Sequence, residues 1–385
     1  MLYVIVLIMV LYCVCKYDIC GHKQYKNTWF YFLLFLFIII AGFSYRLGGD
    51  NISYIKEFPM YQMNNGYSWE ELTNYNGRQP LWVLMSKLCK SVINEYWFFR
   101  FIHSLFLNSL FFFAFRKITK YLFTTILFYF VLVYFEFNFQ VMRQSIAVGL
   151  FLTSMSKYRN NKWLSYYVIN LIGFLFHESA VVTFIVPLIK LLGISIKSII
   201  IYFIISIAGA IVGPLIVDAI LPNVMNTFLG EKANIYWSNI DENGTPTLGL
   251  NIILNVFIPF IFILKKFKSN HTDIIDYFVI AYGVLYGLGL SLPIVYRFSQ
   301  FFQMFYFICY IEIFVLLGVW TKSKLRLNSR KIFIFLCLSF LAYRGRMYLN
   351  PYGDTNIPSY VQFYPYSSVF FKTRDINREL LYKYM

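Results

Sequence analysis

Charged side chains are scarce in this chain. Asp, Glu, Lys and Arg make up 14% of its 385 residues, and 59% of the residues are hydrophobic. A soluble domain carries roughly 25% charged residues, so the composition excludes an ordinary soluble protein. Nor are there segments of about ten residues that alternate between polar and apolar, as a transmembrane β-barrel requires. The apolar runs are long and continuous, which predicts membrane-spanning helices.

Cysteine, linkers and repeats are also in short supply. Six cysteines fall mostly within the apolar runs, which excludes a disulfide framework, and Cys13-Val14-Cys15 alone is weak evidence for a metal. No stretch rich in Pro or Ser separates two domains, and no internal repeat is visible. The apolar start, residues 1–15, lacks a basic segment before it and a cleavage site after it, and is expected to be a retained anchor. We therefore predict a single membrane domain over 1–385.

The apolar runs predict an all-α polytopic integral membrane protein. Each run is bounded by short polar stretches, and there are about twelve of them at the length that spans a bilayer. The predicted spans are 1–15, 29–45, 96–115, 121–137, 141–156, 163–176, 179–192, 199–219, 249–264, 274–293, 298–319 and 332–349.

Basic residues are concentrated in alternate connections between these spans. Nineteen of the 34 Lys and Arg residues lie there, with only Asp18 and Asp273 as acids. By the positive-inside rule these connections are cytoplasmic. The net charge of +16 then reflects topology, and no nucleic-acid partner is predicted.

The complementary connections are expected to face outward. Three are long enough to have structure of their own, namely the loops 46–95 and 220–248 and the C-terminal tail 350–385. Within the first, Leu81, Leu84, Met85 and Leu88 recur at helical spacing, with Lys87 and Lys90 opposite. This pattern predicts an amphipathic helix on the outer membrane surface.

The first outer loop begins with RLGGD. Gly48-Gly49 permits a tight turn, so Arg46 and Asp50 can point at one spot. Asp50 can then serve as a general base for a sugar hydroxyl or orient Arg46. A simple interfacial anchor explains the same residues.

A second motif is FEFNFQVMRQ. Glu136, Asn138 and Gln140 alternate with Phe, which predicts an extended break before a helix that begins near Arg143. A helix N-terminus that carries an Arg suits phosphate oxygens. The alternative is an Arg whose side chain reaches to the membrane interface.

Two further motifs lie at tight outer turns. In FHES, His177 and Glu178 separate two apolar segments, which allows catalysis or substrate contact but equally a structural His and a helix-capping Glu. Arg297 follows Pro293 just ahead of a long helix and is a further candidate ligand for phosphate. The alternative is an Arg whose side chain only reaches to the membrane interface.

These motifs, in this order, resemble the EpsG family of polysaccharide-biosynthesis membrane proteins, a branch of the Wzy-type polymerases. The resemblance covers essentially the whole chain. It rests on Arg46, Gly49, Asp50 and Tyr54; on Arg143, Gln144 and Ala147; on Phe176, His177 and Ser179; and on Tyr296, Arg297 and Phe298.

The resemblance implies polymerisation of undecaprenyl-diphosphate-linked repeat units at the outer face of the bacterial cytoplasmic membrane, for capsule, exopolysaccharide or O antigen. It also implies a GT-C-like architecture and a metal-independent reaction with no cofactor. A flippase and a chain-length regulator of the same pathway are the expected partners.

The resemblance also distributes roles among the motif residues. Arg143, Arg297 and Arg46 would hold the diphosphate, His177 or Asp50 would accept the proton of the acceptor hydroxyl, and Gln144 and Glu178 would support them. Three other functions remain open: a flippase or transporter for lipid-linked oligosaccharides, a glycosyltransferase that uses polyprenyl-monophosphate sugars, and a non-catalytic membrane partner.

Overall fold

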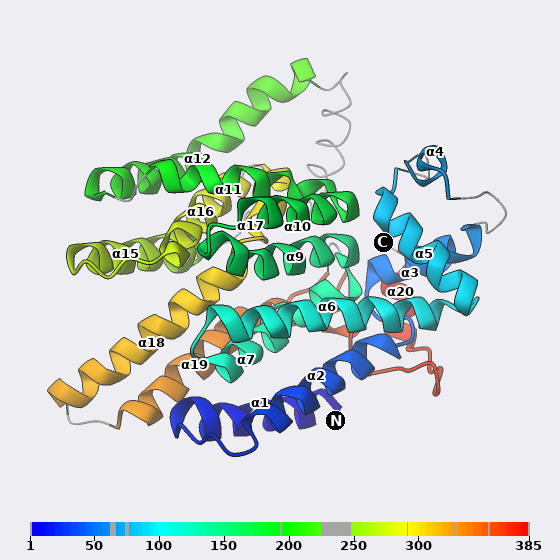
Figure 1. Cartoon of the computed structure of the whole chain (residues 1–385), viewed down its shortest axis with the longest axis horizontal. Helices are drawn as coiled ribbons and strands as arrows, with labels where there is room; N and C mark the ends of the chain where they lie inside the picture. The colour runs from blue at the N-terminus through cyan, green and yellow to red at the C-terminus, as the bar shows by residue number, and fades with distance from the viewer. Residues whose placement is uncertain are drawn as a thin grey trace. The chain divides into compact units, whose positions relative to one another are not determined.

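The computed structural model describes residues 2–61, 67–73, 77–192, 195–224, 248–290, 292–325, 328–352 and 355–383. Over these ranges the chain is helical, with isolated β-bridges in place of strands (Figure 1). The all-α prediction is therefore confirmed. The outer loop predicted over 220–248 lies almost wholly outside the described residues.

Five helices in the described ranges are long and apolar enough to cross a membrane: Leu2–Ile19, Tyr96–Ile118, Gly249–Lys268, Gln303–Ser323 and Ser329–Leu349. Shorter apolar helices of 10–17 residues accompany them, for example Lys26–Gly42 and Trp163–Phe176. The apolar helices establish a membrane protein. The count of about twelve spans and the GT-C-like architecture remain predictions.

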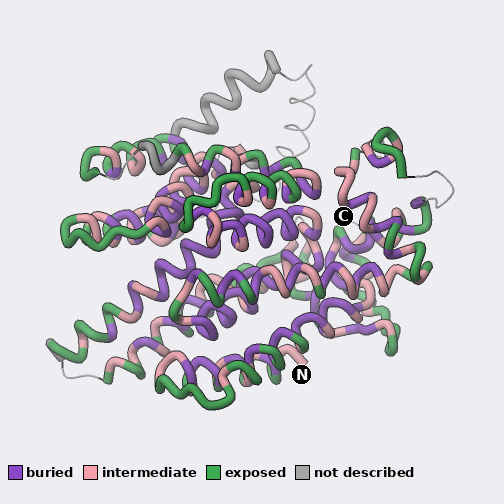
Figure 2. Tube along the Cα trace, viewed as in Figure 1, coloured by how far each residue is buried: buried purple, intermediate pink, exposed green. Residues whose placement is uncertain are grey.

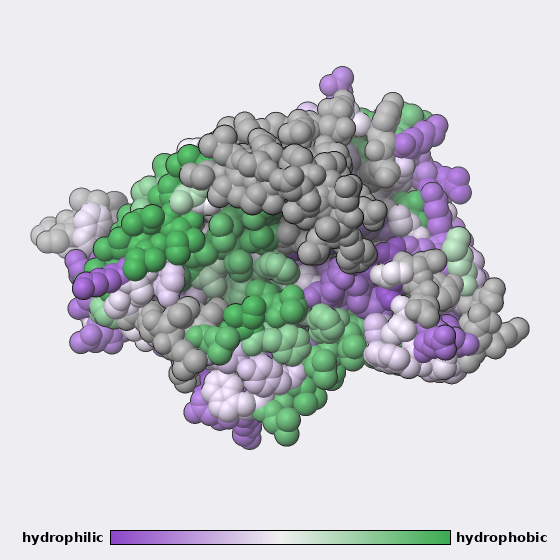
Figure 3. All heavy atoms as spheres, turned by 90° about the horizontal axis from the view of Figure 1, so that it is seen from above, coloured by the Kyte–Doolittle hydropathy of each residue, from purple (hydrophilic) through white to green (hydrophobic). Residues whose placement is uncertain are grey.

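Helices with one buried and one exposed apolar side are typical of this chain. In α2 (Lys26–Gly42) the side chains of Phe30, Leu33 and Phe37 are buried, while Phe32 and Phe35 are exposed. Figure 2 shows this alternation along many helices, and Figure 3 shows hydrophobic side chains gathered over a broad area of one face. Exposed apolar surface on this scale is expected where helices contact lipid.

The chain divides into two compact units. Unit 1 comprises residues 1–181 and 330–385, and unit 2 comprises 182–329. The single domain expected over 1–385 remains a prediction.

Unit 1 holds the N-terminal helices and the C-terminal tail. Its helices are α1 (Leu2–Cys13), α2, α3 (Gly49–Glu57), α4 (Trp69–Thr73), α5 (Pro80–Val92), α6 (Tyr96–Ile118), α7 (Leu122–Leu132), α8 (Tyr134–Phe139), α9 (Met142–Arg159), α10 (Trp163–Phe176), α19 (Ser329–Gly345) and α20 (Ile376–Leu381).

Small residues let the central helices of unit 1 pack closely. A Cβ at Gly149 of α9 would lie 3.0 Å from Leu110 of α6, and one at Gly173 of α10 would lie 3.6 Å from Ala147 of α9. In Figure 1, α6, α9 and α10 run side by side. Close approach at small residues is the usual way in which helices associate in a membrane.

One end of unit 1 is tied together by a buried arginine. The guanidinium of Arg100 donates to the carbonyl oxygens of Asn138 (2.6 Å) and Ala41 (2.8 Å) and to Ser44 Oγ (3.1 Å). Carbonyl groups at helix C-termini carry partial negative charge, so they satisfy this cation. Arg100 thereby joins the end of α2, the start of α6 and α8.

The extended break predicted over FEFNFQVM is wrong. Residues Tyr134–Phe139 form the helix α8, and the chain turns only at Gln140 and Val141 before α9. Phe137, Asn138 and Phe139 are all buried, so this helix is covered on several sides. The Phe residues therefore reflect a buried helix and not the alternating faces of a strand. The start of a helix near Arg143 is confirmed.

The amphipathic helix predicted in the first outer loop is confirmed as α5, with one difference. Its protein-facing side carries Trp82, Val83 and also Lys87, which was expected on the polar side. Lys87 Nζ lies 3.9 Å from the Glu71 carboxylate, and Leu88 is half exposed. Its location on a membrane surface remains a prediction.

The described α-helices of unit 2 are α11 (Val181–Leu192), α12 (Ile196–Val224), α14 (Leu248–Ile252), α15 (Ile258–Lys268), α16 (Ile274–Gly289), α17 (Pro293–Ser299) and α18 (Gln303–Leu325). Ser206 Oγ of α12 donates to the Gly283 carbonyl of α16 at 2.6 Å. Lys266 pairs with Asp276 (2.7 Å) and Glu312 (3.2 Å), which joins α15, α16 and α18.

Candidate functional site

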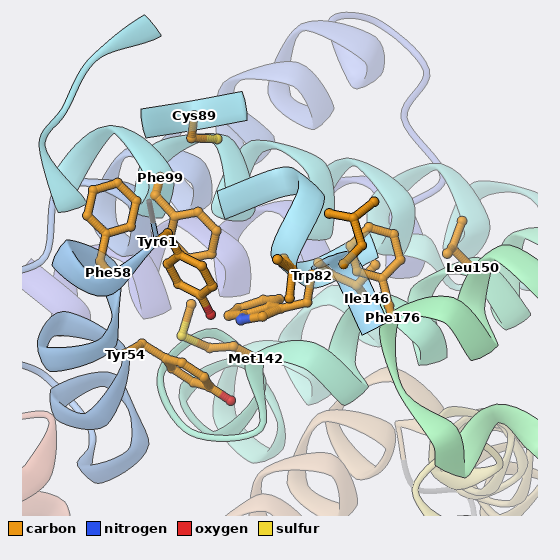
Figure 4. Packing of buried hydrophobic residues seen from close by; sticks show 12 residues of the cluster. Tyr54, Phe58, Tyr61, Trp82, Cys89, Phe99, Met142, Ile146, Leu150 and Phe176 are labelled. Atoms are coloured by element: carbon orange, nitrogen blue, oxygen red, sulfur yellow. The ribbon is translucent and has the colours of Figure 1, made fainter. Parts of the chain in front are cut away.

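The polar residues of interest in unit 1 gather around Tyr54. This residue lies on α3, and its ring packs against Trp82 of α5 with centroids 5.0 Å apart. Figure 4 shows both within the cluster that joins the segment 46–95 to α6 and α9. The loop is thus fixed to the helix bundle by aromatic packing, which positions the Tyr54 hydroxyl.

Arg143 reaches this hydroxyl from the first turn of α9. Its Nε donates to Tyr54 Oη at 3.2 Å, and its Nη1 donates to Gln79 Oε1 at 2.6 Å. Both partners are neutral, and within the described ranges Arg143 has no ion pair. Its positive charge is therefore oriented but not neutralised, at the positive end of a helix.

Arg78, next to Gln79 in the chain, approaches the same tyrosine. Its guanidinium carbon lies 5.5 Å from the Tyr54 ring centroid. It also forms a two-contact ion pair with Glu57 at the end of α3, with Nε to Oε2 at 3.1 Å. Two arginines thus lie beside Tyr54, one with a carboxylate partner.

Asp50 is exposed and lies in the first turn of α3, four residues before Tyr54. Burial raises the pKa of the Tyr54 hydroxyl above 10.0, Arg143 and Arg78 lower it, and Asp50 raises it. Since each of these charges acts on one hydroxyl, Arg143, Asp50 and Arg78 form a single electrostatic group around Tyr54.

Arg46 has a different environment. The turn predicted at Gly48 is present, with φ +81°, but the Arg46 side chain forms a two-contact ion pair with Glu379 at 2.8 and 2.6 Å. Tyr382 Oη also donates to the Arg46 carbonyl at 3.1 Å. The structure thus gives Arg46 a role in holding the C-terminal tail.

The tail makes further contacts with the turn. The Gly48 N–H donates to the Gln362 carbonyl at 3.0 Å, and the Tyr45 N–H donates to the Ser367 carbonyl at 2.9 Å. The side chains of Gln140 and Gln362 are also hydrogen-bonded. Consequently the tail holds both the entry to α3 and the turn before α9.

His177 is buried at the end of α10. Its Nδ1 accepts from the Ser179 N–H (3.2 Å) and contacts Ser179 Oγ at 2.7 Å, so the ring caps a short 3-10 turn that begins at the exposed Glu178. Because a backbone N–H can only donate, Nδ1 is the acceptor, and the neutral ring carries its proton on Nε2. This tautomer is inferred from the hydrogen bonds.

Two other predicted residues are placed as follows. Gln144 is buried next to Arg143 on α9. Arg297 is half-buried on α17, which belongs to unit 2, whereas the group around Tyr54 belongs to unit 1.

Within the described residues no group of three or more His, Cys, Asp or Glu side chains could hold a metal ion.

A comparison with models of known protein families gives a match over most of the chain. Residues 27–368 match the EpsG family, which is most of the chain. The chain belongs to the EpsG family. No curated protein and no solved structure matches it. The family and the apolar helices together indicate a membrane protein of polysaccharide biosynthesis.

In this EpsG-family chain, sequence reasoning missed several polar residues. Arg78 and Gln79 precede the amphipathic helix and carried no motif. Arg100 and His103 could have been recognised from the sequence, because ionisable residues inside an apolar span are costly to bury and usually have a functional or structural role. His103 Nε2 lies 3.0 Å from the Met142 carbonyl, and both residues are structural ties around the start of α9.

Proposed function

We propose that this protein polymerises undecaprenyl-diphosphate-linked oligosaccharide repeat units at the outer face of the bacterial cytoplasmic membrane. The observation that carries the proposal is Arg143, whose charge is oriented by Tyr54 and Gln79 and has no carboxylate partner among the residues that the structure describes. A cation of this kind is suited to a diphosphate. Membership of the EpsG family supports the polymerase reading.

The proposed reaction transfers a growing glycan from its carrier to a hydroxyl of the next lipid-linked unit. A bond forms between the acceptor oxygen and the anomeric carbon, and the bond from that carbon to the diphosphate breaks. Negative charge builds on the departing undecaprenyl diphosphate. Arg143 would stabilise this charge more strongly in the transition state than in the ground state, which is what accelerates the step.

The proton of the acceptor hydroxyl must go to a base. Of the two predicted residues, Asp50 is the better supported, because it is exposed and belongs to the group around Tyr54. His177 accepts through Nδ1 from its own turn, so the neutral ring offers a donor at Nε2. We therefore propose Asp50 as the base. For His177 we propose a structural role, in which its ring caps the short turn that begins at Glu178.

Arg46 and Arg297 complete the predicted diphosphate ligands. Arg46 is paired with Glu379, which supports a structural role in its case. Arg297 lies in unit 2 and is retained in the proposal on its motif alone. Gln144, adjacent to Arg143, is proposed to support the start of α9.

The proposal is tested by deleting the gene and locating the lipid-linked intermediate. A polymerase defect leaves single repeat units on the outer leaflet and no long glycan. Accumulation on the inner leaflet would contradict the proposal in favour of a flippase. Loss of activity in the presence of a chelator would instead favour a metal-dependent transferase that uses monophosphate sugars. Sensitivity to a chelator is measured directly by adding EDTA to the purified protein.

A further inference from the structure

Arg78 has the properties of a ligand-binding cation, although no motif contains it. It lies immediately before Gln79, the residue that accepts from Arg143 at 2.6 Å. Its guanidinium lies over the face of the Tyr54 ring, and Arg143 donates to the hydroxyl of the same ring. The two cations are therefore both in contact with a single tyrosine side chain.

The ion pair that now holds Arg78 is accessible to solvent. The Arg78 and Glu57 side chains are 22% and 19% exposed. Both side chains are thus mostly covered but still contact water, which partly screens their attraction. A ligand with two negatively charged phosphates can therefore compete with Glu57 for Arg78.

A monophosphate and a diphosphate would use this arrangement differently. Arg143 alone can contact one phosphate group. The second phosphate of a diphosphate needs a second donor, and a guanidinium provides a planar fork that matches phosphate oxygens. Arg78 is the second guanidinium beside Tyr54.

We propose that Arg78 is a second diphosphate-binding residue, which exchanges Glu57 for the distal phosphate when a prenyl diphosphate binds at Arg143. This inference rests on the proposed function for the class of ligand. Glu57 is then a competitor that keeps Arg78 in place in the empty site. It favours diphosphate over monophosphate carriers, because only a diphosphate displaces it.

The two members of the ion pair give opposite predictions. Binding of undecaprenyl diphosphate and undecaprenyl monophosphate is measured on the full-length protein in nanodiscs. Arg78→Gln should weaken diphosphate binding about tenfold, the contribution of a charge-assisted hydrogen bond, and leave monophosphate binding unchanged. Glu57→Gln should strengthen diphosphate binding several-fold, since the competing carboxylate is gone. Arg116→Gln, on the far end of α6, is the matched control.

Outcomes that overturn the inference are equally specific. If both variants weaken binding of both lipids and also lower the thermal unfolding temperature, the ion pair stabilises the fold and Arg78 does not bind the ligand. If Arg78→Gln binds diphosphate as the wild type does, Arg78 is not a ligand. Arg78→Lys keeps the positive charge that pairs with Glu57 but lacks the planar fork of the guanidinium. Comparing its unfolding temperature with its diphosphate affinity therefore separates loss of folding from loss of binding.

Failure of the proposed function is distinguishable from failure of this inference. A wild-type protein that binds diphosphate through Arg78 but forms no polymer would contradict the polymerase and leave the inference intact. A wild-type protein that forms polymer while Arg78→Gln retains full diphosphate affinity would contradict the inference alone.

Discussion

At the residue scale, the decisive contrast is between three arginines of unit 1. Arg46 is paired with Glu379, Arg78 with Glu57, and Arg143 with the neutral Tyr54 and Gln79. The sequence places all three near helix ends, but partners decide their chemistry. An Arg that already has a carboxylate gains less from an anionic ligand than one that has only neutral acceptors.

Tyr54→Phe tests how much the hydroxyl contributes to orienting Arg143. The ring contact with Trp82 is retained, and one hydrogen bond from the charged Arg143 guanidinium is lost, which is worth about 1.5–3 kcal/mol. We expect a rise of about tenfold in KM for the lipid-linked donor, measured in a reconstituted transfer assay. Tyr12→Phe, whose hydroxyl contacts Lys16, is the control. An unchanged KM would mean that Arg143 is oriented without Tyr54.

At the scale of elements, Gly48 allows α3 to begin against α8. It has φ +81°, and a Cβ there would lie 2.6 Å from the Phe139 Cβ. Gly48→Ala should destabilise the protein through backbone strain of roughly 1–2 kcal/mol and overpacking of roughly 1–3 kcal/mol.

Gly77→Ala is the matched control for Gly48→Ala. Gly77 has φ +65° but open space around a Cβ, so this variant should show the backbone cost alone. The measurement is thermal unfolding of both variants in detergent. Equal losses would mean that contact with α8 is unimportant.

The C-terminal tail is the element whose docking depends on pH. The hydrogen bond and charge of Arg46 hold the pKa of Glu379 below its usual 4.5. A carboxyl group with a lowered pKa contributes stability above its usual pKa, and this contribution is lost as pH falls through the folded value. The tail should therefore loosen as the pH falls below 4.5.

A fluorophore on the exposed position of Phe371→Cys reports this loosening as a drop in anisotropy. Glu379→Gln should abolish the pH-dependent step, whereas the control Glu95→Gln, at an exposed carboxylate, should keep it. A step of the same size in Glu379→Gln would assign it to another group.

The sequence predicted some elements well and others not at all. The helical spacing of apolar residues was sufficient to predict α5 as a helix, because periodicity is a local property, but it did not predict which side is buried against the protein. The helix α8 was mistaken for an extended segment, since Phe137 and Phe139 are buried along with Asn138 between them. The Arg46–Glu379 pair joins residues 333 positions apart, and no local pattern can reveal it.

At the scale of the whole molecule, the sidedness predicted from charge has a counterpart in unit 1. Ties among Arg100, His103 and Met142 bring the end of α2 and the starts of α6 and α9 together. Arg116, Lys117, Lys157 and Arg159 lie at the opposite ends of α6 and α9. One end thus carries Asp50, Arg143 and His177, and the other is basic.

Sidedness is measured by labelling single cysteines in whole cells, with the native exposed Cys15 and Cys20 replaced by Ser. Cysteines at exposed positions 50 and 178 should react with an impermeant reagent from outside. Those at 23 and 160 should react only after permeabilisation. Positions 50 and 178 on opposite sides of the membrane would contradict a single outward site.

The most direct test of the central claim is polymer formation by purified protein in liposomes supplied with one lipid-linked repeat unit. Wild type should produce a ladder of long glycans on a gel. Arg143→Ala should fold normally and lose at least tenfold in rate, because a charge-assisted hydrogen bond contributes about 1.5–3 kcal/mol. Arg143→Lys should recover part of it, and Arg116→Ala should retain the full ladder. A wild-type ladder from Arg143→Ala would contradict the account.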